Sequence, residues 1–335
     1  MDFSQFLAVN PAAELGRGLA DSAKLHIPDG FLSPLVSILF WILAVGLIAV
    51  AVRRSERELG ERQIPLAGIM AAFIFAAQMI NFPVAGGTSG HLLGGALAAI
   101  VLGPWTGILV MTAVVGVQGL LFQDGGLVVM GANIFNMGLI TVIIGYGLYR
   151  GVAGRSRGTK LAVAGVAAWL SVMAGALVTS LQLWLSGTAL LAIVMPAMLG
   201  VHAIIGLGEA LVTVAALSFI LRTRPDLLGE EAAEPKGGRG WIVAGVITSL
   251  AVVLLSPFAS ANPDGLERVA EDLGFIHRGL SASYSILPDY AIPWLSEGAT
   301  STIAAGAIGA LIVAGVTVAV VRIMRRRHRS GVNVS

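Results

Sequence analysis

The chain has 335 residues, of which 56% are hydrophobic and 12% are charged, with 21 Lys and Arg against 19 Asp and Glu. Soluble domains carry about 25% charged residues, so the composition excludes a soluble enzyme, a nucleic-acid-binding protein and a disordered chain. Glycine is abundant, at 43 residues, and cysteine is absent. These two features favour helices packed in lipid and exclude disulfides and thiol chemistry.

Apolar segments predict an all-α membrane bundle with about nine spans, because a span needs roughly 20 mostly apolar residues. The third predicted span is short, and Gly103 and Pro104 separate it from the fourth, a pattern typical of a binding site. The segment 186–198 is too short to cross, and we expect it to be re-entrant or to lie at the surface. The predicted spans are 34–52, 65–81, 92–103, 105–122, 134–149, 161–185, 199–221, 241–258 and 302–321.

Basic residues indicate the orientation of the bundle. Of the 21 Lys and Arg, 17 fall in the segments that follow spans one, five, seven and nine, which leaves Arg17, Lys24, Arg268 and Arg278 elsewhere. The positive-inside rule then places the N-terminus outside the cell and the C-terminus in the cytoplasm. We therefore expect a multi-pass protein of a prokaryotic cell membrane, with the lipid bilayer as a partner and no nucleic acid.

Composition shifts divide the chain into four parts. Residues 1–25 lack the pattern of a signal peptide and are predicted to be an N-terminal extension. Residues 26–222 form the main membrane domain, and the charged, Pro- and Gly-rich segment 223–240 is predicted to be a cytoplasmic linker. Residues 241–335 form a second module with two spans and an acidic external loop at 259–300.

Two histidines are predicted to lie on the outer face, each at the start of a span. His26 precedes the first span, and His91 opens the third. On spacing alone, two such imidazoles either share a metal ion or are ordinary interfacial residues.

The residues around both histidines resemble the cobalt/nickel substrate-capture (S) components of energy-coupling-factor transporters, the CbiM/NikM type. His26 begins the sequence His-Ile-Pro-Asp-Gly, and His91 lies in Ser-Gly-His-Leu-Leu-Gly. Further similar motifs follow in order at 102–105, 118–126 and 131–138, so the resemblance covers roughly residues 26–222. The sequence Pro-Asp-Gly-Leu-Glu at 263–267 resembles the PDGLE domain of a two-span, CbiN-like accessory subunit, here fused to the C-terminus.

The resemblance implies a metal site with four nitrogen ligands. They are the N-terminal amine, the backbone nitrogen and side chain of the next histidine, and a second histidine, which correspond here to Leu25, His26 and His91. Four nitrogens in a plane suit Ni²⁺ and Cu²⁺, and Co²⁺ is the other substrate of the family. Ni²⁺ or Co²⁺ is thus the transported ligand, with no resident cofactor. The amine is available only if Leu25 begins the mature chain, so we expect cleavage after Lys24 or translation from codon 25.

Seven further residues are candidates for orienting the metal ligands. Asn133 also fits a helix N-cap. His202 and Glu209 share one helix face, where either structural pairing or a functional role is open. The candidates are Ser89, Gln118, Asp124, Asn133, Asn136, His202 and Glu209.

Two other functions remain as alternatives. Gly87-Thr88-Ser89-Gly90 fits the Gly-x-Ser-Gly pattern of intramembrane serine proteases, with His202 as a base, and a vitamin-specific S component would share the architecture. The sequence contains no Gly-x-x-x-x-Gly-Lys-(Ser/Thr) loop, so ATP hydrolysis is expected in separate subunits, and we expect this chain not to be an enzyme. The resemblance implies a transmembrane coupling (T) subunit and two separate ATP-binding subunits as partners. We expect the acidic loop 259–300 to assist metal loading rather than to hold the ion.

Overall fold

The structure is a computed structural model that describes residues 26–58, 60, 62–228, 240–295 and 298–332. The predicted extension 1–25, including Leu25, lies outside the described residues, as does most of the predicted linker 223–240. The described chain is helical apart from one short hairpin, so the all-α prediction is confirmed.

Seven helical segments are long and apolar enough to cross a membrane. They agree with seven of the predicted spans, and two contain a π-helical stretch: Gln118–Phe122 continues α5, and Phe135–Ile140 joins α6 to α7. The elements that form them are α2 (Pro34–Glu58), α5 (Pro104–Val117), α6 (Met130–Ile134) with α7 (Thr141–Arg150), α8 (Arg157–Leu185), α9 (Leu191–Thr223), α10 (Gly240–Val253) and α12 (Ala299–Val332).

The other two predicted spans are shorter helices, so nine full-length spans are not found among the described residues. The second corresponds to α3 (Gln63–Gln78) and the third to α4 (Gly95–Leu102). With eight residues, α4 is only about 12 Å long, too short to cross by itself. It turns back at Gly103 and packs against α5, where a Cβ on Gly107 would lie 3.1 Å from the Ala99 Cα. Because α4 and α5 form a hairpin, α5 returns the chain to the side of the membrane from which α4 starts. The orientation of the remaining helices is therefore the same whether α4 crosses the whole membrane or only part of it.

The expectation for 186–198 is wrong. Helix α9 begins at Leu191 and continues through Pro196 to Thr223 without a break. An internal proline removes a single helical hydrogen bond, which a membrane helix tolerates. The apolar segments on either side of Gly200 therefore belong to one helix, about 50 Å long, rather than to a span and a separate surface segment.

Arginines and tryptophans from several elements meet at one end of the bundle. The Arg54 guanidinium lies 5.8 Å from the ring centre of Trp105, and Arg62 Nη1 lies 3.7 Å from Asp226 Oδ2. Arg224 pairs with the same carboxylate at 2.8 Å and lies over Trp241. The segments after α2 and α9 thus lie together, as the grouping of basic residues requires.

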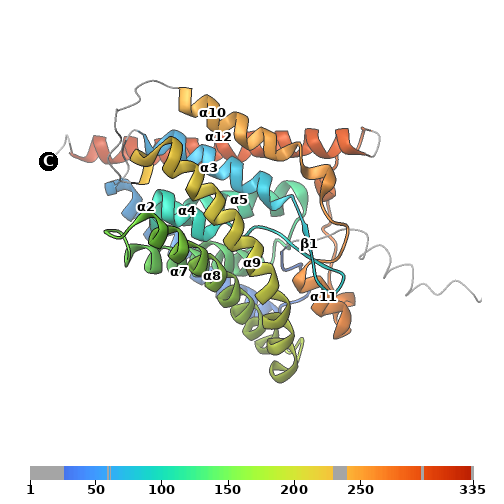
Figure 1. Ribbon diagram of the computed structural model, residues 1–335. Helices are drawn as coiled ribbons and strands as arrows, with labels where there is room; N and C mark the ends of the chain where they lie inside the picture. Colours follow the sequence, from blue (N-terminus) through green and yellow to red (C-terminus); the bar gives the residue numbers. More distant parts are fainter. Residues whose placement is uncertain (1–25, 59, 61, 229–239, 296–297, 333–335) are drawn as a thin grey trace, which may run out of the picture.

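The second module packs along one side of the bundle. Figure 1 shows α10 and α12 beside α3, with α7, α8 and α9 on the other side. At one end of the bundle, α11 (Gly265–Asp272) lies next to the hairpin of β1 (Phe82–Val84) and β2 (Thr88–Gly90), whose strands pair antiparallel with Pro83 opposite Ser89. This end carries the histidines.

The predicted orientation can be tested by cysteine labelling, because the chain contains no cysteine of its own. Ala85→Cys, at the tip of the hairpin, and Ser283→Cys, in the external segment, are exposed, and Gly154→Cys is exposed at the opposite end with no atom near its Cβ. We expect an impermeant maleimide to label the first two in intact cells and Gly154→Cys only after permeabilisation. Labelling of Gly154→Cys in intact cells would reverse the orientation.

Candidate metal centre

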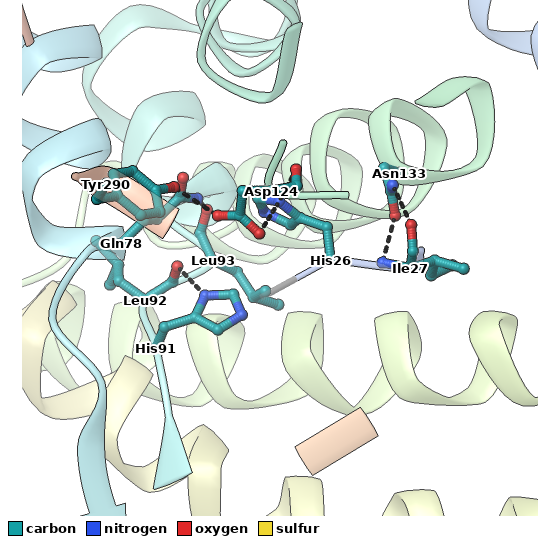
Figure 2. Close-up of polar contacts among 9 residues, drawn as sticks. All are labelled: His26, Ile27, Gln78, His91, Leu92, Leu93, Asp124, Asn133 and Tyr290. Atoms are coloured by element: carbon teal, nitrogen blue, oxygen red, sulfur yellow. Dashed lines mark hydrogen bonds and ion pairs between the residues drawn. The ribbon is translucent and has the colours of Figure 1, made fainter. Parts of the chain in front are cut away.

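Four non-helical segments converge at the end of the bundle that holds His26 and His91. They are the stretches around residues 26–30, 88–94, 123–129 and 260–265. A cavity of about 80 Å³ lies between them, and its walls include His26, His91, Asn133, Asn136, His202 and Asp264. Figure 2 shows the central residues of this region.

The segment that carries His26 is fixed on both sides of its backbone. Ile27 N–H donates to Asn133 Oδ1 at 3.1 Å, and Asn133 Nδ2 donates back to the Ile27 carbonyl at 3.0 Å. The Asp29 carboxylate accepts hydrogen bonds from the backbone N–H groups of three successive residues, 127–129. Gly126 permits this approach, because a Cβ there would lie 2.0 Å from Asp29 Oδ1. The position of His26 therefore depends on two distant parts of the chain, the side chain of Asn133 and the backbone of residues 127–129 that Asp29 binds.

The segment that carries His91 is held from the opposite side. Gln78 Nε2 donates to the Leu93 carbonyl at 2.8 Å. The Glu209 carboxylate, on α9, accepts from Leu93 N–H at 2.6 Å and from Gly94 N–H at 2.9 Å. Of the two roles left open for Glu209, the structure thus shows pairing within the bundle, and the group it pairs with is the loop that presents His91.

The two histidines lie next to each other although 65 residues separate them. Both are buried, and their ring centres are 5.8 Å apart with the planes at 80°. An imidazole nitrogen binds a first-row metal at roughly 2.0–2.1 Å, so two rings that share one ion have centres at most about 6 Å apart. The observed separation is compatible with a shared ion. Nε2 of His26 is buried without a hydrogen-bond partner in the described structure.

Asp124 orients His26 and is itself held by the second module. His26 Nδ1 lies 3.2 Å from Asp124 Oδ1 and 3.1 Å from its carbonyl oxygen, and the Tyr290 hydroxyl donates to Asp124 Oδ2. The Tyr290 ring stacks on Phe122 with centres 4.7 Å apart. Figure 2 shows Tyr290, Asp124 and His26 in this order. A tyrosine of the segment between α10 and α12 is thus connected to a predicted metal ligand through one carboxylate.

The charges of this group are coupled. Burial of the His26 ring disfavours the imidazolium, but the charge and hydrogen bonds of Asp124 outweigh this and raise the pKa of His26 above its ordinary value. Burial likewise opposes ionisation of Asp124, yet His26 and the Tyr290 hydroxyl hold its pKa below the ordinary value. Burial and the nearby carboxylate raise the pKa of Tyr290 well above 10, so it remains a donor.

Ser89 and His202 do not form a nucleophile–base pair in the described structure. Ser89 Oγ donates to the Asn262 carbonyl at 2.8 Å, and Ser89 N–H donates to the Pro263 carbonyl. His202 Nδ1 lies 2.8 Å from the Met198 carbonyl, and the edge of its ring abuts Gly265, where a Cβ would lie 2.8 Å from Cε1. The hydroxyl that a serine protease needs is therefore bonded to the segment that follows α10, and His202 forms a wall of the cavity.

The three remaining candidates line or support the cavity. The N-cap interpretation of Asn133 is wrong, because α6 begins at Met130 with Val129 at the cap, and Asn133 holds Ile27 instead. Asn136 donates to Thr179 and exchanges hydrogen bonds with Gln182, which joins the segment after α6 to α8. Gln118 is fully buried, its side chain lies beside Tyr290, and its carbonyl accepts from Asp124 N–H.

Sequence reasoning missed the roles of Asp29, Tyr290 and Asp264. Asp29 and Tyr290 carry no local signal, because their partners, residues 127–129 and Asp124, lie about 100 or more positions away. Asp264 caps α11 through Glu267 N–H at 2.7 Å, in a capping box that the sequence Asp-x-x-Glu encodes. It is also buried at the cavity, where desolvation raises its pKa.

No group of three His, Cys, Asp or Glu side chains that could hold a metal ion is found within the described ranges. An ion between His26 and His91 would thus need further ligands from outside that set of side chains. Backbone nitrogen is the donor type that the sequence analysis anticipated.

Comparisons with known proteins match both parts of the chain. The family profile described as "Cobalt uptake substrate-specific transmembrane region" matches residues 26–227, and that of the "PDGLE domain" matches residues 239–326. A putative fused nickel transport protein NikMN of Archaeoglobus fulgidus is 36% identical over 307 residues, which cover 90% of this chain and 99% of the relative. A cobalt transport protein CbiM of Sorangium cellulosum is 34% identical over 219 residues, which cover 61% of this chain and 94% of the relative.

Solved structures agree with these sequence matches. The crystal structure of a truncated transition metal transporter is 31% identical, has a TM-score of 0.54, and covers 59% of this chain and 98% of that chain. The similarity in sequence and in structure therefore concerns proteins that carry transition metals.

The coupling of Asp124 to His26 predicts how metal binding depends on pH. The pKa of His26 is raised above 6.5, the ordinary value for histidine. As the pH falls, protons should therefore begin to displace the metal while the pH is still above 6.5. Asp124→Asn removes the opposing charge and leaves the burial, so the inflection should move below pH 6.5. Loss of the orienting carboxylate should also weaken binding by about 10–100-fold at neutral pH.

Titration calorimetry with Ni²⁺ between pH 5 and 8 measures both effects. Asp272→Asn is the control, since Asp272 is exposed and pairs with Arg268 on the surface. If the inflection stays at the same pH in Asp124→Asn, Asp124 does not control the protonation of a metal ligand.

Proposed function

This chain belongs to the cobalt uptake substrate-specific transmembrane family, with a PDGLE domain fused behind it, and we propose that it captures Ni²⁺ or Co²⁺ as the substrate-binding subunit of an energy-coupling-factor transporter. It is a cobalt or nickel transport component, and its relatives are transport proteins rather than enzymes. Its seven apolar helices and its family point to a multi-pass membrane protein.

The observation that carries the proposal is the buried pair of His26 and His91 on irregular backbone. Neutral imidazole is a ligand for Ni²⁺, Co²⁺ and Cu²⁺ and a poor one for Mg²⁺ and Ca²⁺. Both rings lie at one small cavity. The loop that carries each ring is held by hydrogen bonds between its backbone and a side chain of another element. Neither a protease nor a vitamin carrier requires such a pair.

We propose that two backbone nitrogens complete the ligand set, the amine of Leu25 and the amide of His26. This coordination makes a specific demand on the His26 ring. A chelate that joins the amide nitrogen of a histidine to its own imidazole closes only through Nδ1, the nitrogen next to the point of attachment. In this structure Nδ1 faces Asp124, so chelation through Nδ1 must break this contact.

A second mode of coordination is favoured by the geometry of Asp124. With His26 Nδ1 held by the carboxylate, the buried Nε2 is the nitrogen left for the ion. This is the carboxylate–histidine–metal arrangement found in many metal sites, and it needs no amine from Leu25. The two modes differ in whether the chain must begin at residue 25.

The remaining parts of the proposal follow the resemblance to S components. We propose that a transmembrane coupling subunit and two ATP-binding subunits complete the transporter, and that the histidine end of the bundle faces outward. The external segment of the second module then lies over the site on the side from which the ion arrives, which supports a role in metal loading.

Substitution of the two histidines tests the site directly. His26→Ala and His91→Ala should each weaken Ni²⁺ and Co²⁺ binding by at least about 100-fold, because each removes one of few ligands. Metal content and competition among Ni²⁺, Co²⁺, Cu²⁺ and Zn²⁺ on the purified chain provide the measurement. Ser89→Ala is the matched control, since it removes the hydroxyl contacts to the Asn262 and Pro263 carbonyls and no proposed metal ligand. Normal binding by both histidine variants would place the site elsewhere.

Intact-mass analysis of protein made from the native gene tests the amine ligand. If the four-nitrogen site is correct, the chain that binds Ni²⁺ tightly begins at residue 25. A longer chain that retains residues 1–24 has a peptide carbonyl on this nitrogen and should bind weakly. Tight binding by that longer chain would refute the amine ligand and favour coordination through His26 Nε2.

A further inference from the structure

A strained backbone marks one contact between the two modules. Three non-glycine residues of the described structure have a left-handed backbone: Gln123, Asp289 and Tyr290, with φ of 59°, 51° and 56°. This conformation is uncommon for residues with a side chain, and for one as bulky as tyrosine it is strained. Gln123 directly precedes Asp124, whose carboxylate accepts a hydrogen bond from the Tyr290 hydroxyl. The strained positions therefore lie on both sides of a single hydrogen bond.

The Tyr290 ring holds the strained turn in place. It is buried, and its centre lies 4.7 Å from that of Phe122 and 6.0 Å from that of Phe75. Figure 2 shows the ring reaching Asp124, which lies between Tyr290 and His26. Because a change of φ redirects the side chain of the same residue, a relaxed, negative φ at Tyr290 would turn its ring away from Phe122. The hydrogen bond to Asp124 and a relaxed backbone therefore exclude each other.

The Asp124 carboxylate is bound at both of its oxygens. Oδ1 lies 3.2 Å from His26 Nδ1, and Oδ2 accepts from the Tyr290 hydroxyl. The terminal torsion of an aspartate has broad energy minima, so a carboxylate with a single partner can turn, whereas two partners fix its plane. Tyr290 thus fixes the oxygen that holds the His26 ring. With Nδ1 held in this way, the buried Nε2 is the nitrogen left for an ion.

We propose that Tyr290 is a positioning residue, and that its hydrogen bond to Asp124 is a releasable clasp through which the second module sets the metal affinity of the His26 site. This role rests on the proposed function, with the ion bound through His26 Nε2. While the clasp is closed, Asp124 holds the ring ready for the ion. When it opens, the backbone at 289–290 relaxes, Asp124 loses one partner, and the site binds the ion more weakly. The second module can thus change the affinity without supplying a ligand.

Tyr290→Phe in the purified full chain tests the clasp, because it removes the hydroxyl and retains the stacked ring. The Ni²⁺ affinity should fall about 10-fold, at the lower end of the effect of removing a group that orients a metal ligand. A chelator chase should show correspondingly faster release of the ion. Tyr284→Phe is the matched control from the same segment, since the Tyr284 hydroxyl donates to the Gly119 carbonyl at 3.1 Å instead. It should change neither quantity.

A double-mutant cycle shows whether Tyr290 acts through Asp124. Asp124→Ala offers neither oxygen, so adding Tyr290→Phe to it should lower the Ni²⁺ affinity by less than about twofold further. A full loss in this background as well overturns the proposal, and so does an unchanged affinity of Tyr290→Phe alone. Tighter binding by Tyr290→Phe also overturns it, because the clasp would then keep Nδ1 away from the ion.

Amide exchange provides a second measurement that a merely structural role would not affect. Coupling between two binding events is reciprocal, so Ni²⁺ must stabilise the closed clasp by the same factor of about 10. Two amides flank the turn: Leu287 N–H donates to the Leu121 carbonyl at 2.9 Å, and Ile292 N–H donates to Ser301 Oγ at 2.8 Å. Hydrogen–deuterium exchange of residues 287–292 should slow when Ni²⁺ is added to the unaltered chain, and should not slow in Tyr290→Phe. The same response in both chains overturns the proposal.

The unaltered chain and His26→Ala separate this proposal from the proposed function. If the unaltered chain binds Ni²⁺, His26→Ala does not, and Tyr290→Phe binds as tightly as the unaltered chain, the proposed function stands and the clasp is refuted. If the unaltered chain does not bind Ni²⁺ at all, the proposed function is refuted, and the clasp with it.

Discussion

Non-helical backbone within a membrane bundle has no water to bond, and this constraint governs how the centre of the protein is built. The loops that carry His26 and His91 expose N–H and carbonyl groups that no helix satisfies. Asp29 and Asn133 bind one loop, and Glu209 and Gln78 bind the other. Leaving one such buried group unpaired costs about 1–3 kcal/mol. The same hydrogen bonds that make the loops tolerable therefore fix the two imidazoles at 5.8 Å.

The second module takes part in this arrangement mainly through backbone. Ser89 N–H binds the Pro263 carbonyl, Leu280 N–H binds the Asp29 carbonyl, and Leu287 N–H binds the Leu121 carbonyl. Such contacts depend on the path of the chain more than on its side chains. Tyr290 is the exception, since its hydroxyl reaches Asp124 and through it His26. The PDGLE domain is thus a structural part of the wall around the histidines.

Features with a local signature were predictable from the sequence, and features created by contact between distant segments were not. Apolar length predicted nine spans, of which seven are helices long enough to cross, and the motifs around His26 and His91 singled out both rings before their proximity was visible. The capping box at Asp264 is also local. By contrast, α4 looked like a span because hydropathy does not reveal where a helix turns back. Asn133 looked like a helix cap because its partner, Ile27, lies 106 residues away.

Electrostatics constrains what the cavity can accept once the ion has lost its water. A divalent cation buried among apolar helices needs compensating negative charge nearby. In the site that we propose, His26 must release its proton to bind the ion, and Asp124, whose pKa is held low, then faces the ion as an anion. Under the proposed four-nitrogen coordination the deprotonated amide of His26 supplies the second negative charge. Asp264, whose pKa burial raises, is then needed only in its neutral form. Coordination through His26 Nε2 without the amide lacks one charge, and Asp264 must ionise to balance the ion. The protonation of Asp264 in the metal complex therefore reports which of the two modes the protein uses.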